Sequence, residues 1–305
     1  MKQEFGEKSI RHTDVVAKGS RLTPAGSSQI EIGTRLGTEL TVLGIVNDQG
    51  SEPVYLVWHH QYWCPMACKV FESHDGARRE AEILNVVAHP NIVRCFGVYG
   101  SNCLLMEFLE GPTLSQLLDT RPKKRLSIGD AVRVAIHLGT ALKHIHDTGL
   151  LHLDVKPPNV VAASRRPILC DFGIARWQHA PRVKGVRGTD PYIAPEEYLL
   201  EAVTPAADIF GLGVTLYQLL TGTLPFPDRR EDDAFPQVVQ TPARLRHHRA
   251  AVPRALEGLV LECLSRDPRA RPQLVTLLPR LHGFIRSGPA MWPAGFQPDL
   301  PVRGN

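Results

Sequence analysis

The chain has 305 residues, 43% of them hydrophobic, so it is long enough for one generous domain or a two-lobed one with a substantial core. Its 35 Lys and Arg against 31 Asp and Glu give a formal net charge of +4, which does not suggest a nucleic-acid-binding protein. No apolar run approaches the ~18 residues needed to cross a membrane, and the first residues lack the apolar core of a signal peptide. We therefore expect a cytoplasmic protein without a membrane span.

Six cysteines are scattered along the chain, most of them in apolar runs typical of strands. Neither their spacing nor any nearby pair of histidines matches a zinc-binding pattern. We expect reduced, mostly buried thiols, as in other proteins of the cytoplasm. The cysteines are Cys64, Cys68, Cys95, Cys103, Cys170 and Cys263.

Residues 1–30 are polar and rich in Ser, Thr and Gly without a sustained period, which predicts a flexible N-terminal arm. Short apolar runs, separated by Asn, Asp, Gly and Pro, then predict strands. The predicted strands are 40–46, 54–59, 66–71, 92–98 and 103–108.

One helix interrupts these strands, at 74–87, where Ile83 and Leu84 belong to an apolar stripe with helical spacing. Glu80 falls on the same stripe and therefore points inward. An inward carboxylate needs a cationic partner, and the nearest candidate on a predicted strand is Lys69.

Beyond the last predicted strand the pattern changes to helices. Ser127 and Asp130 have the spacing of a helix N-cap and its third residue, and Gly149 follows as a stop signal. A nearly all-apolar run from Thr204 to Gly222 predicts a helix buried in the core of this part. Further helices are predicted at 255–264 and 274–285, and the Pro- and Gly-rich tail at 287–305 is predicted to be irregular.

The most reactive groups lie between these helices, in the stretch 151–173. Its apolar runs predict a catalytic loop followed by two short strands, 159–163 and 168–170, around a polar turn. One carboxylate can take a proton from a hydroxyl, an ammonium can neutralise phosphate, and an amide and a second carboxylate can hold Mg²⁺. The four side chains with these properties are Asp154, Lys156, Asn159 and Asp171.

Taken in order, the motifs of the chain resemble those of the eukaryotic-type (Hanks-type) protein kinases over roughly residues 40–286. The chain resembles the serine/threonine branch of this family, because a Lys stands two residues after Asp154 and Thr189 stands ahead of an Ala-Pro-Glu motif. The motifs are Ala67-Cys68-Lys69 with Glu80, the run from His152 to Asn159, Asp171-Phe172-Gly173, and the run from Gly188 to Glu196. In addition, Asp208 stands where the family keeps an Asp that anchors the catalytic loop, and Arg271 stands where it keeps a partner for Glu196.

The resemblance implies an α+β fold with the two lobes of a protein kinase. The N-lobe, at about 31–108, would be a five-stranded antiparallel sheet with one helix, and the C-lobe, at about 109–286, would be mainly helical.

The same resemblance implies a serine/threonine protein kinase that uses ATP and Mg²⁺ to phosphorylate Ser and Thr hydroxyls of protein substrates. Asp154 would orient and deprotonate the hydroxyl, and Lys156 would stabilise the transferred phosphoryl group. Asn159 and Asp171 would hold Mg²⁺. For the nucleotide, the resemblance implies that Lys69, fixed by Glu80, contacts the α- and β-phosphates. It implies that Val54, Ala67 and Val161 surround adenine. Met106 would be the gatekeeper, and Glu107 to Leu109 would form the hinge.

The loop that would cover the phosphates departs from the family pattern. Counting back from Val54, the positions of the family's glycines hold Asn47, Gln49 and Glu52. Glycines there let backbone N–H groups approach phosphate, and Glu52 would add a repelling charge. A pseudokinase that acts as a scaffold or allosteric partner is therefore an alternative. A small-molecule kinase is a second one, which the segment from Gly188 to Glu196 argues against because it resembles a platform for peptides.

A second departure is Leu153, where many family members carry an Arg that pairs with a phosphorylated activation segment. Residues 174–188 contain no Ser, Thr or Tyr, so the two absences agree. We expect activity that does not depend on phosphorylation in this segment.

The same segment, 174–188, is basic and has no acidic residue. It is either a solvated loop or a surface that attracts an acidic substrate or partner. Its cationic residues are Arg176, Arg182, Lys184 and Arg187.

Overall fold

The structure is a computed structural model that describes residues 29–48, 52–164, 166–180, 185–227 and 235–285. The chain divides into two compact units, which we call the sheet unit and the helical unit. The sheet unit comprises Met1–Ala81 and Cys95–Phe108, and the helical unit comprises Glu82–Arg94 and Leu109–Asn305. The predicted tail and nearly all of the predicted N-terminal arm lie outside the described residues.

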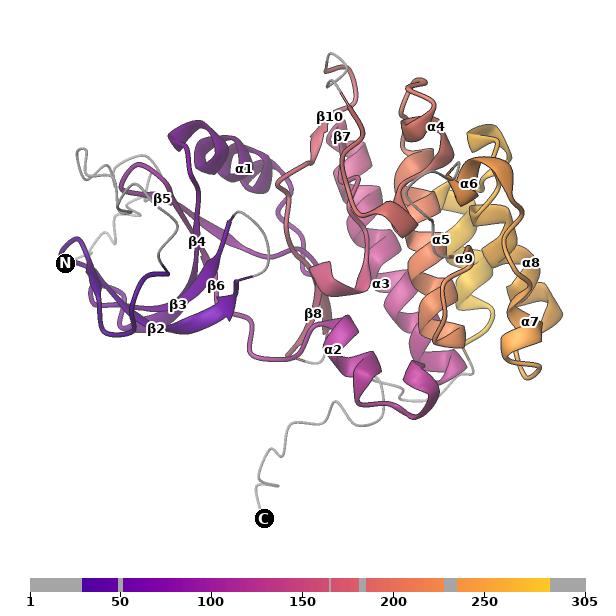
Figure 1. The fold of residues 1–305 in the computed structure, drawn as a ribbon, viewed down its shortest axis with the longest axis horizontal. Coiled ribbons are helices and arrows are strands. Elements are labelled where there is room, and N and C mark those ends of the chain that lie inside the picture. Colours follow the sequence, from indigo (N-terminus) through magenta and orange to yellow (C-terminus); the bar gives the residue numbers. More distant parts are fainter. Residues whose placement is uncertain (1–28, 49–51, 165, 181–184, 228–234, 286–305) are drawn as a thin grey trace, which may run out of the picture. The chain divides into compact units, whose positions relative to one another are not determined.

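The sheet unit is built on a six-stranded antiparallel sheet in the order β1-β2-β3-β4-β6-β5 (Figure 1). The five predicted strands are confirmed, and β1 is a two-residue addition at the edge, too short to show any alternation in the sequence. The strands are β1 (Arg35–Leu36), β2 (Leu40–Asn47), β3 (Val54–His59), β4 (Cys64–Val70), β5 (Cys95–Tyr99) and β6 (Cys103–Glu107).

The prediction that the fourth strand begins at residue 92 was wrong. β5 begins at Cys95, whereas Ile92 forms a bridge with Leu169 in the helical unit. Val93 also donates its backbone N–H to the carbonyl of Leu169 at 3.0 Å, and Leu169 donates its own N–H to the carbonyl of Asn91 at 2.8 Å. Ile92 and Val93 are thus apolar because they are buried in the helical unit and not because they belong to the strand.

Alternating side chains of the strands form the core of the sheet unit. Burial in β3 alternates strictly, so that Tyr55 and Val57 point into the core, as the period of two for a half-buried strand requires. The core residues are Leu36, Leu40, Val42, Tyr55, Val57, Met66, Cys68, Val70, Tyr99, Cys103 and Leu105.

Helix α1 (His74–Val86) follows β4, as predicted. Its stripe at Ala77, Ile83 and Leu84 is buried, and Glu80 is buried with it at 2% exposure. The predicted inward direction of Glu80 is therefore confirmed.

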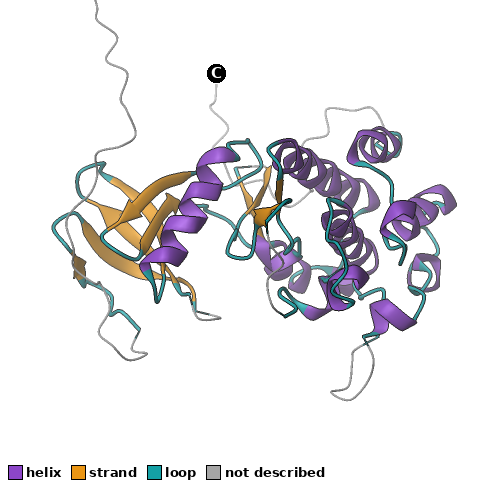
Figure 2. Ribbon diagram, turned by 90° about the horizontal axis from the view of Figure 1, so that it is seen from above, coloured by secondary structure: helices purple, strands orange, loops and turns teal. Residues whose placement is uncertain are grey.

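The helical unit contains most of the helices, and its strands are short (Figure 2). The α-helices are α2 (Leu114–Asp119), α3 (Ile128–Asp147), α4 (Pro195–Tyr198), α5 (Ala206–Thr221), α6 (Pro236–Val239), α7 (Leu245–His248), α8 (Arg254–Cys263) and α9 (Leu274–His282). Single 3₁₀ turns occur at Pro122–Lys124, Pro157–Asn159, Asp190–Tyr192 and Pro268–Ala270. Among the described helices, none combines the length and the hydropathy needed to cross a bilayer.

Helices α3 and α5 form the centre of the helical unit, where α3 packs against α5 and α9, and α5 packs against α8. Ser127 caps α3 as predicted, because its hydroxyl accepts the N–H of Asp130 at 3.1 Å. Helix α5 is buried almost all round and ends at Gly222 in the left-handed conformation, also as predicted. Helix α2 was not predicted individually, although Thr113 and Gln116 form a capping box at its start.

Two short antiparallel strand pairs follow α3. The predicted hairpin is confirmed as β8 (Val160–Ala163) paired with β9 (Arg166–Leu169). A second pair, β7 (Leu150–Leu151) with β10 (Arg176–Trp177), was not predicted because two residues carry no periodic signal. These pairs fix both ends of the stretch that contains the candidate catalytic residues.

Candidate active site

In the sheet unit, strand β4 places Lys69 in a buried position, with 5% of its surface exposed. Its Nζ donates to Oε2 of Glu80 on α1 at 2.8 Å. Because both groups are buried, each charge offsets the cost of desolvating the other. Lys69 Nζ also lies 3.1 Å from Oε2 of Glu52, a contact that the sequence did not predict.

The predicted nucleotide-binding residues of the sheet unit lie on three neighbouring strands around Lys69. Val54 on β3 is directly opposite Lys69, and Ala67 on β4 is opposite Met106 on β6. Glu107 ends β6. The remaining two residues belong to the helical unit: Leu109 follows the unit boundary, and Val161 lies on β8, where it bridges to Thr113.

In the helical unit, Asp154 lies at the centre of a hydrogen-bonded cluster and is 7% exposed. Lys156 Nζ donates to Asp154 Oδ2 at 2.7 Å, and Asn159 Nδ2 donates to the same oxygen at 2.7 Å. The hydroxyl of Thr189 donates to the other oxygen, Oδ1, at 3.3 Å and accepts from Lys156 Nζ. The predicted residues Asp154, Lys156 and Asn159 are thus brought together.

Thr189 joins this cluster from 33 residues beyond Lys156 in the chain, a contact that sequence reasoning missed. Its place before the Ala-Pro-Glu motif was a signal for the serine/threonine branch, but it did not indicate a direct contact with Asp154. Thr189 orients the carboxylate of Asp154 and the ammonium of Lys156 at once.

The backbone of the loop that carries Asp154 is held by Asp208, at the start of α5. Asp208 Oδ2 accepts the N–H of His152 at 3.0 Å, and Oδ1 accepts the N–H of Leu153 at 2.7 Å. His146 Nε2 lies 2.8 Å from Oδ2. Burial alone would raise the pKa of Asp208, but the hydrogen bond and charge interaction with His146, together with the N–H of His152, bring this pKa below its usual value. Asp208 is therefore an anionic anchor for the loop.

Asp171 follows β9 and has a positive φ of 60°. The N–H of Cys170 donates to the backbone carbonyl of Asn159 at 2.8 Å, so the hairpin brings the residue before Asp171 next to Asn159. Phe172 packs edge-on against His152 at 4.6 Å between ring centroids. Burial lowers the pKa of His152, so its imidazole is a neutral packing partner here.

The predicted magnesium ligands Asn159 and Asp171 have a donor set that fits the ion. Nδ2 of Asn159 is directed at Asp154, which leaves the amide oxygen as the ligand atom. Within the described residues, no three His, Cys, Asp or Glu side chains gather into a closed metal site. Mg²⁺ is commonly held by one or two protein oxygens together with substrate phosphates, so an open pair of this kind suits it.

The segment after the site is fixed by a buried ion pair. The two terminal guanidinium nitrogens of Arg271, Nη1 and Nη2, donate to the two carboxylate oxygens of Glu196, each at 2.7 Å. Arg271 also donates to the backbone carbonyls of Ser265 and Ala206 at 2.8 Å. The predicted pairing of Glu196 with Arg271 is confirmed.

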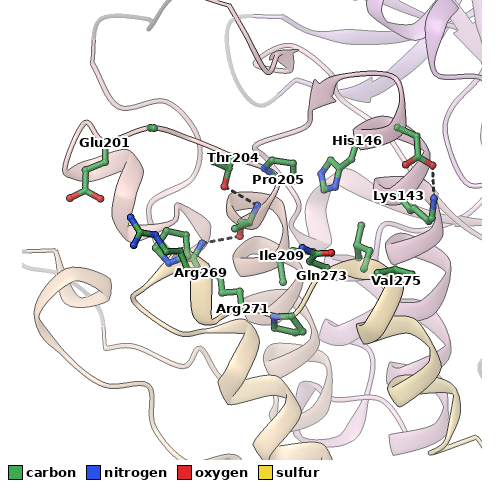
Figure 3. Close-up of a pocket in the computed structure, with 16 residues that line it drawn as sticks. Lys143, His146, Glu201, Thr204, Pro205, Ile209, Arg269, Arg271, Gln273 and Val275 are labelled. Atoms are coloured by element: carbon green, nitrogen blue, oxygen red, sulfur yellow. Dashed lines mark hydrogen bonds and ion pairs between the residues drawn. The ribbon is translucent and has the colours of Figure 1, made fainter.

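A separate cavity of about 780 Å³ lies in the helical unit between α3, the start of α5 and the start of α9 (Figure 3). His146 and Arg271 line it together with Lys143, Arg269 and Val275, as Figure 3 shows. None of the predicted catalytic or metal-binding side chains is part of its wall. The cavity is therefore not the candidate active site.

Comparison with known proteins agrees with these motifs. A family model described as the protein kinase domain matches residues 50–280. The chain is 32% identical to the serine/threonine-protein kinase Pkn1 of Myxococcus xanthus, over 86% of this chain and 41% of the relative. It is 32% identical to the serine/threonine-protein kinase PkaA of Streptomyces coelicolor (65% of this chain, 38% of the relative) and 28% identical to PrkC of Bacillus subtilis (78% and 39%).

The chain spans about four-tenths of the length of these curated relatives. The match nevertheless covers the sheet unit from β3 onward and the helical unit to α9, including every residue of the Asp154 cluster. The order of the motifs, the α+β architecture and the family match lead to one assignment: this chain belongs to the protein kinase domain family.

Proposed function

We propose that the protein is a serine/threonine protein kinase that transfers the γ-phosphoryl group of ATP to Ser or Thr hydroxyls of protein substrates. The observation that carries this proposal is the cluster in which Lys156, Asn159 and Thr189 all contact the carboxylate of Asp154. The names of the curated relatives also support it, and they do not support the alternative of a pseudokinase.

Asp154 is proposed as the general base. Its carboxylate is oriented by hydrogen bonds, so one carboxylate oxygen can receive the proton of an acceptor hydroxyl. The hydroxyl oxygen of the acceptor then attacks the γ-phosphorus of ATP. Lys156, 2.7 Å from the same carboxylate, is placed to stabilise the charge on the phosphoryl group in transfer. Asn159 and Asp171 would hold Mg²⁺. The bound ion would neutralise part of the negative charge of the phosphates.

The sheet unit is proposed to bind the nucleotide. Lys69, fixed by Glu80, would contact the α- and β-phosphates. The side chains proposed around adenine and at the hinge are Val54, Ala67, Met106 and Glu107 of the sheet unit, with Leu109 and Val161 of the helical unit. We propose 31–286 as the extent of the kinase domain.

Regulation by phosphorylation of residues 174–188 is not part of this proposal, because this segment has no hydroxyl-bearing side chain. Leu153, in place of the phosphate-pairing Arg, is consistent with that.

If the basic charge of the segment attracts an acidic substrate, charge reversal of Arg182 and Lys184, which lie outside the described residues, will raise KM for an acidic peptide but not for a neutral one.

The decisive test is autophosphorylation and phosphorylation of a generic protein substrate by the wild type and the Asp154→Asn variant. Loss of a general base costs about 10²- to 10⁴-fold in rate, so we expect the Asn variant to lose activity by that factor while it still binds ADP. Asp119→Asn, which removes a charge paired with Lys124 on the surface of the helical unit, is the matched control and should retain activity. Equal rates for the wild type and Asp154→Asn would refute the assignment of intrinsic catalysis.

A further inference from the structure

The phosphate-binding lysine has a second carboxylate beside it. Pro53 precedes β3 and its carbonyl accepts the N–H of Val70, which extends the pairing of β3 with β4 by one residue. Val54 is directly opposite Lys69, so the two side chains share a face of the sheet. Glu52, two residues before Val54, lies on that same face, and its Oε2 reaches within 3.1 Å of Lys69 Nζ.

The two carboxylates at Lys69 differ in their access to water. The side chain of Glu80 is 2% exposed, whereas that of Glu52 is 35% exposed. Separating Glu80 from Lys69 would break an ion pair in which both side chains are buried, which is costly. The carboxylate of Glu52 can move into solvent at a lower cost, because it is already partly hydrated in place. Glu80 is thus the fixed partner of Lys69, and Glu52 is the exchangeable one.

We propose that Glu52 is an affinity-determining residue for the nucleotide phosphates, in which its carboxylate acts as an internal competitor for the ammonium of Lys69. A phosphate that approaches Lys69 meets a like charge on the solvent-accessible side and must displace it. The protein therefore binds nucleotides more weakly than its Lys69–Glu80 pair alone would allow. This inference rests on the proposed function, since it assumes that Lys69 receives the phosphates.

The competition acts on phosphate and not on the base or ribose, and this provides a sharp test. Glu52→Gln keeps the size of the side chain and removes its charge. Glu31→Gln removes the same charge from an exposed position in the same unit and is the matched control. Titration calorimetry at one fixed Mg²⁺ concentration compares the Kd of ADP and of adenosine for the full-length wild type and both variants.

We expect Glu52→Gln to lower the Kd of ADP about three- to tenfold, somewhat above the range for an exposed ion pair because Lys69 is buried. Adenosine should bind all three proteins with the same Kd, and Glu31→Gln should match the wild type for both ligands. In kinase assays, Glu52→Gln should lower KM for ATP by a similar factor.

The inference would be overturned if Glu52→Gln left the Kd of ADP unchanged or raised it. It would also be overturned if the variant bound ADP and adenosine more tightly by the same factor, since this would indicate a change in the shape of the base-binding surface. If the wild type phosphorylates protein and one of these results is found, the inference fails and the proposed function stands. If neither the wild type nor Glu52→Gln binds ADP or phosphorylates protein, the proposed function fails as well.

Discussion

A single buried side chain holds the loop that carries Asp154 in a strained conformation. Leu153 has a φ of 67°, in the left-handed region that costs a non-glycine residue about 1–2 kcal/mol. Its N–H and that of His152 both donate to Asp208, so the anchor compensates for the strain. The carboxylate of Asp154, next in the chain, takes its position from this fixed backbone.

A partly buried carboxyl, that of Glu197, makes stability depend on pH. Burial raises the pKa of Glu197 to about 8, although the N–H of Ala194 partly opposes this shift. In the unfolded chain the group ionises at its ordinary, lower pKa. The stability that the neutral form contributes is therefore complete below about pH 4.5 and is lost as the pH rises toward about 8.

Glu197→Gln cannot ionise and should escape this loss. We expect its Tm to exceed that of the wild type by more at pH 8.5 than at pH 5, as measured by thermal unfolding. Glu201→Gln, at an exposed site close by, should follow the pH dependence of the wild type. The same Tm difference at both pH values would contradict the assignment.

At the residue scale, part of the site could be predicted from the sequence. The pair of Lys69 with Glu80 followed from helical spacing, because a polar residue on an apolar stripe needs a buried partner. The sequence also indicated that Glu52 would repel phosphate, but it could not show the contact with Lys69. That contact depends on the register of β3 against β4, which only the folded sheet fixes.

At the scale of elements, the end of α5 depends on one glycine. Gly222 has a φ of 81°, and a Cβ built there would lie 2.1 Å from the carbonyl oxygen of Lys123. The close approach of the Pro122–Lys124 turn thus leaves no space for a side chain. This explains why the stop signal of the sequence is a glycine.

Gly222→Ala should destabilise the protein by at least about 1–3 kcal/mol, the usual cost of a strained backbone, with a further cost from the clash. Gly258→Ala provides a matched comparison of opposite sign. Gly258 lies inside α8 with open space around its Cβ position, so Ala should stabilise the protein by about 0.5–1 kcal/mol. Urea unfolding of both variants tests this, and a loss of stability in both would argue against the structural reason given.

Elements were predictable where the pattern was long. Helix α3 has a clear N-cap at Ser127, helix α5 has a clear stop at Gly222, and both carry sustained apolar residues, so both were found. Strands β1, β7 and β10 have two residues each and were missed, since pairing with a neighbour, and not periodicity, makes them strands. The start of β5 was misplaced because the apolar residues Ile92 and Val93 are buried in the helical unit.

At the scale of the molecule, the helical unit is held together by contacts between distant segments. Arg271 joins Glu196, the start of α5 and the residues after α8, and its guanidinium also lies over the ring of Phe210 at 5.0 Å. Its partner is 75 residues away in the chain. Arg280 makes a bidentate pair with Glu262 of similar geometry, at 2.6 and 2.8 Å, but on the surface.

The same substitution at these two sites separates burial from geometry. Arg271→Lys should cost about 2–4 kcal/mol, because an ammonium cannot replace the buried fork of hydrogen bonds. Arg280→Lys should cost at most about 1 kcal/mol, because water compensates for the weaker exposed pair. Equal losses in chemical denaturation would show that burial does not govern the contribution of these pairs.

The sequence by itself determined the α+β class, the order of the motifs and the residue types available for chemistry, because these are encoded in local spacing and periodicity. Tertiary structure decided the contacts that neither local spacing nor a motif encodes. Thr189 contacts Asp154, although the two residues belong to segments that are far apart in the chain. The contact of Glu52 with Lys69 is a second example, because it depends on the register of β3 against β4 and has no signal in the sequence.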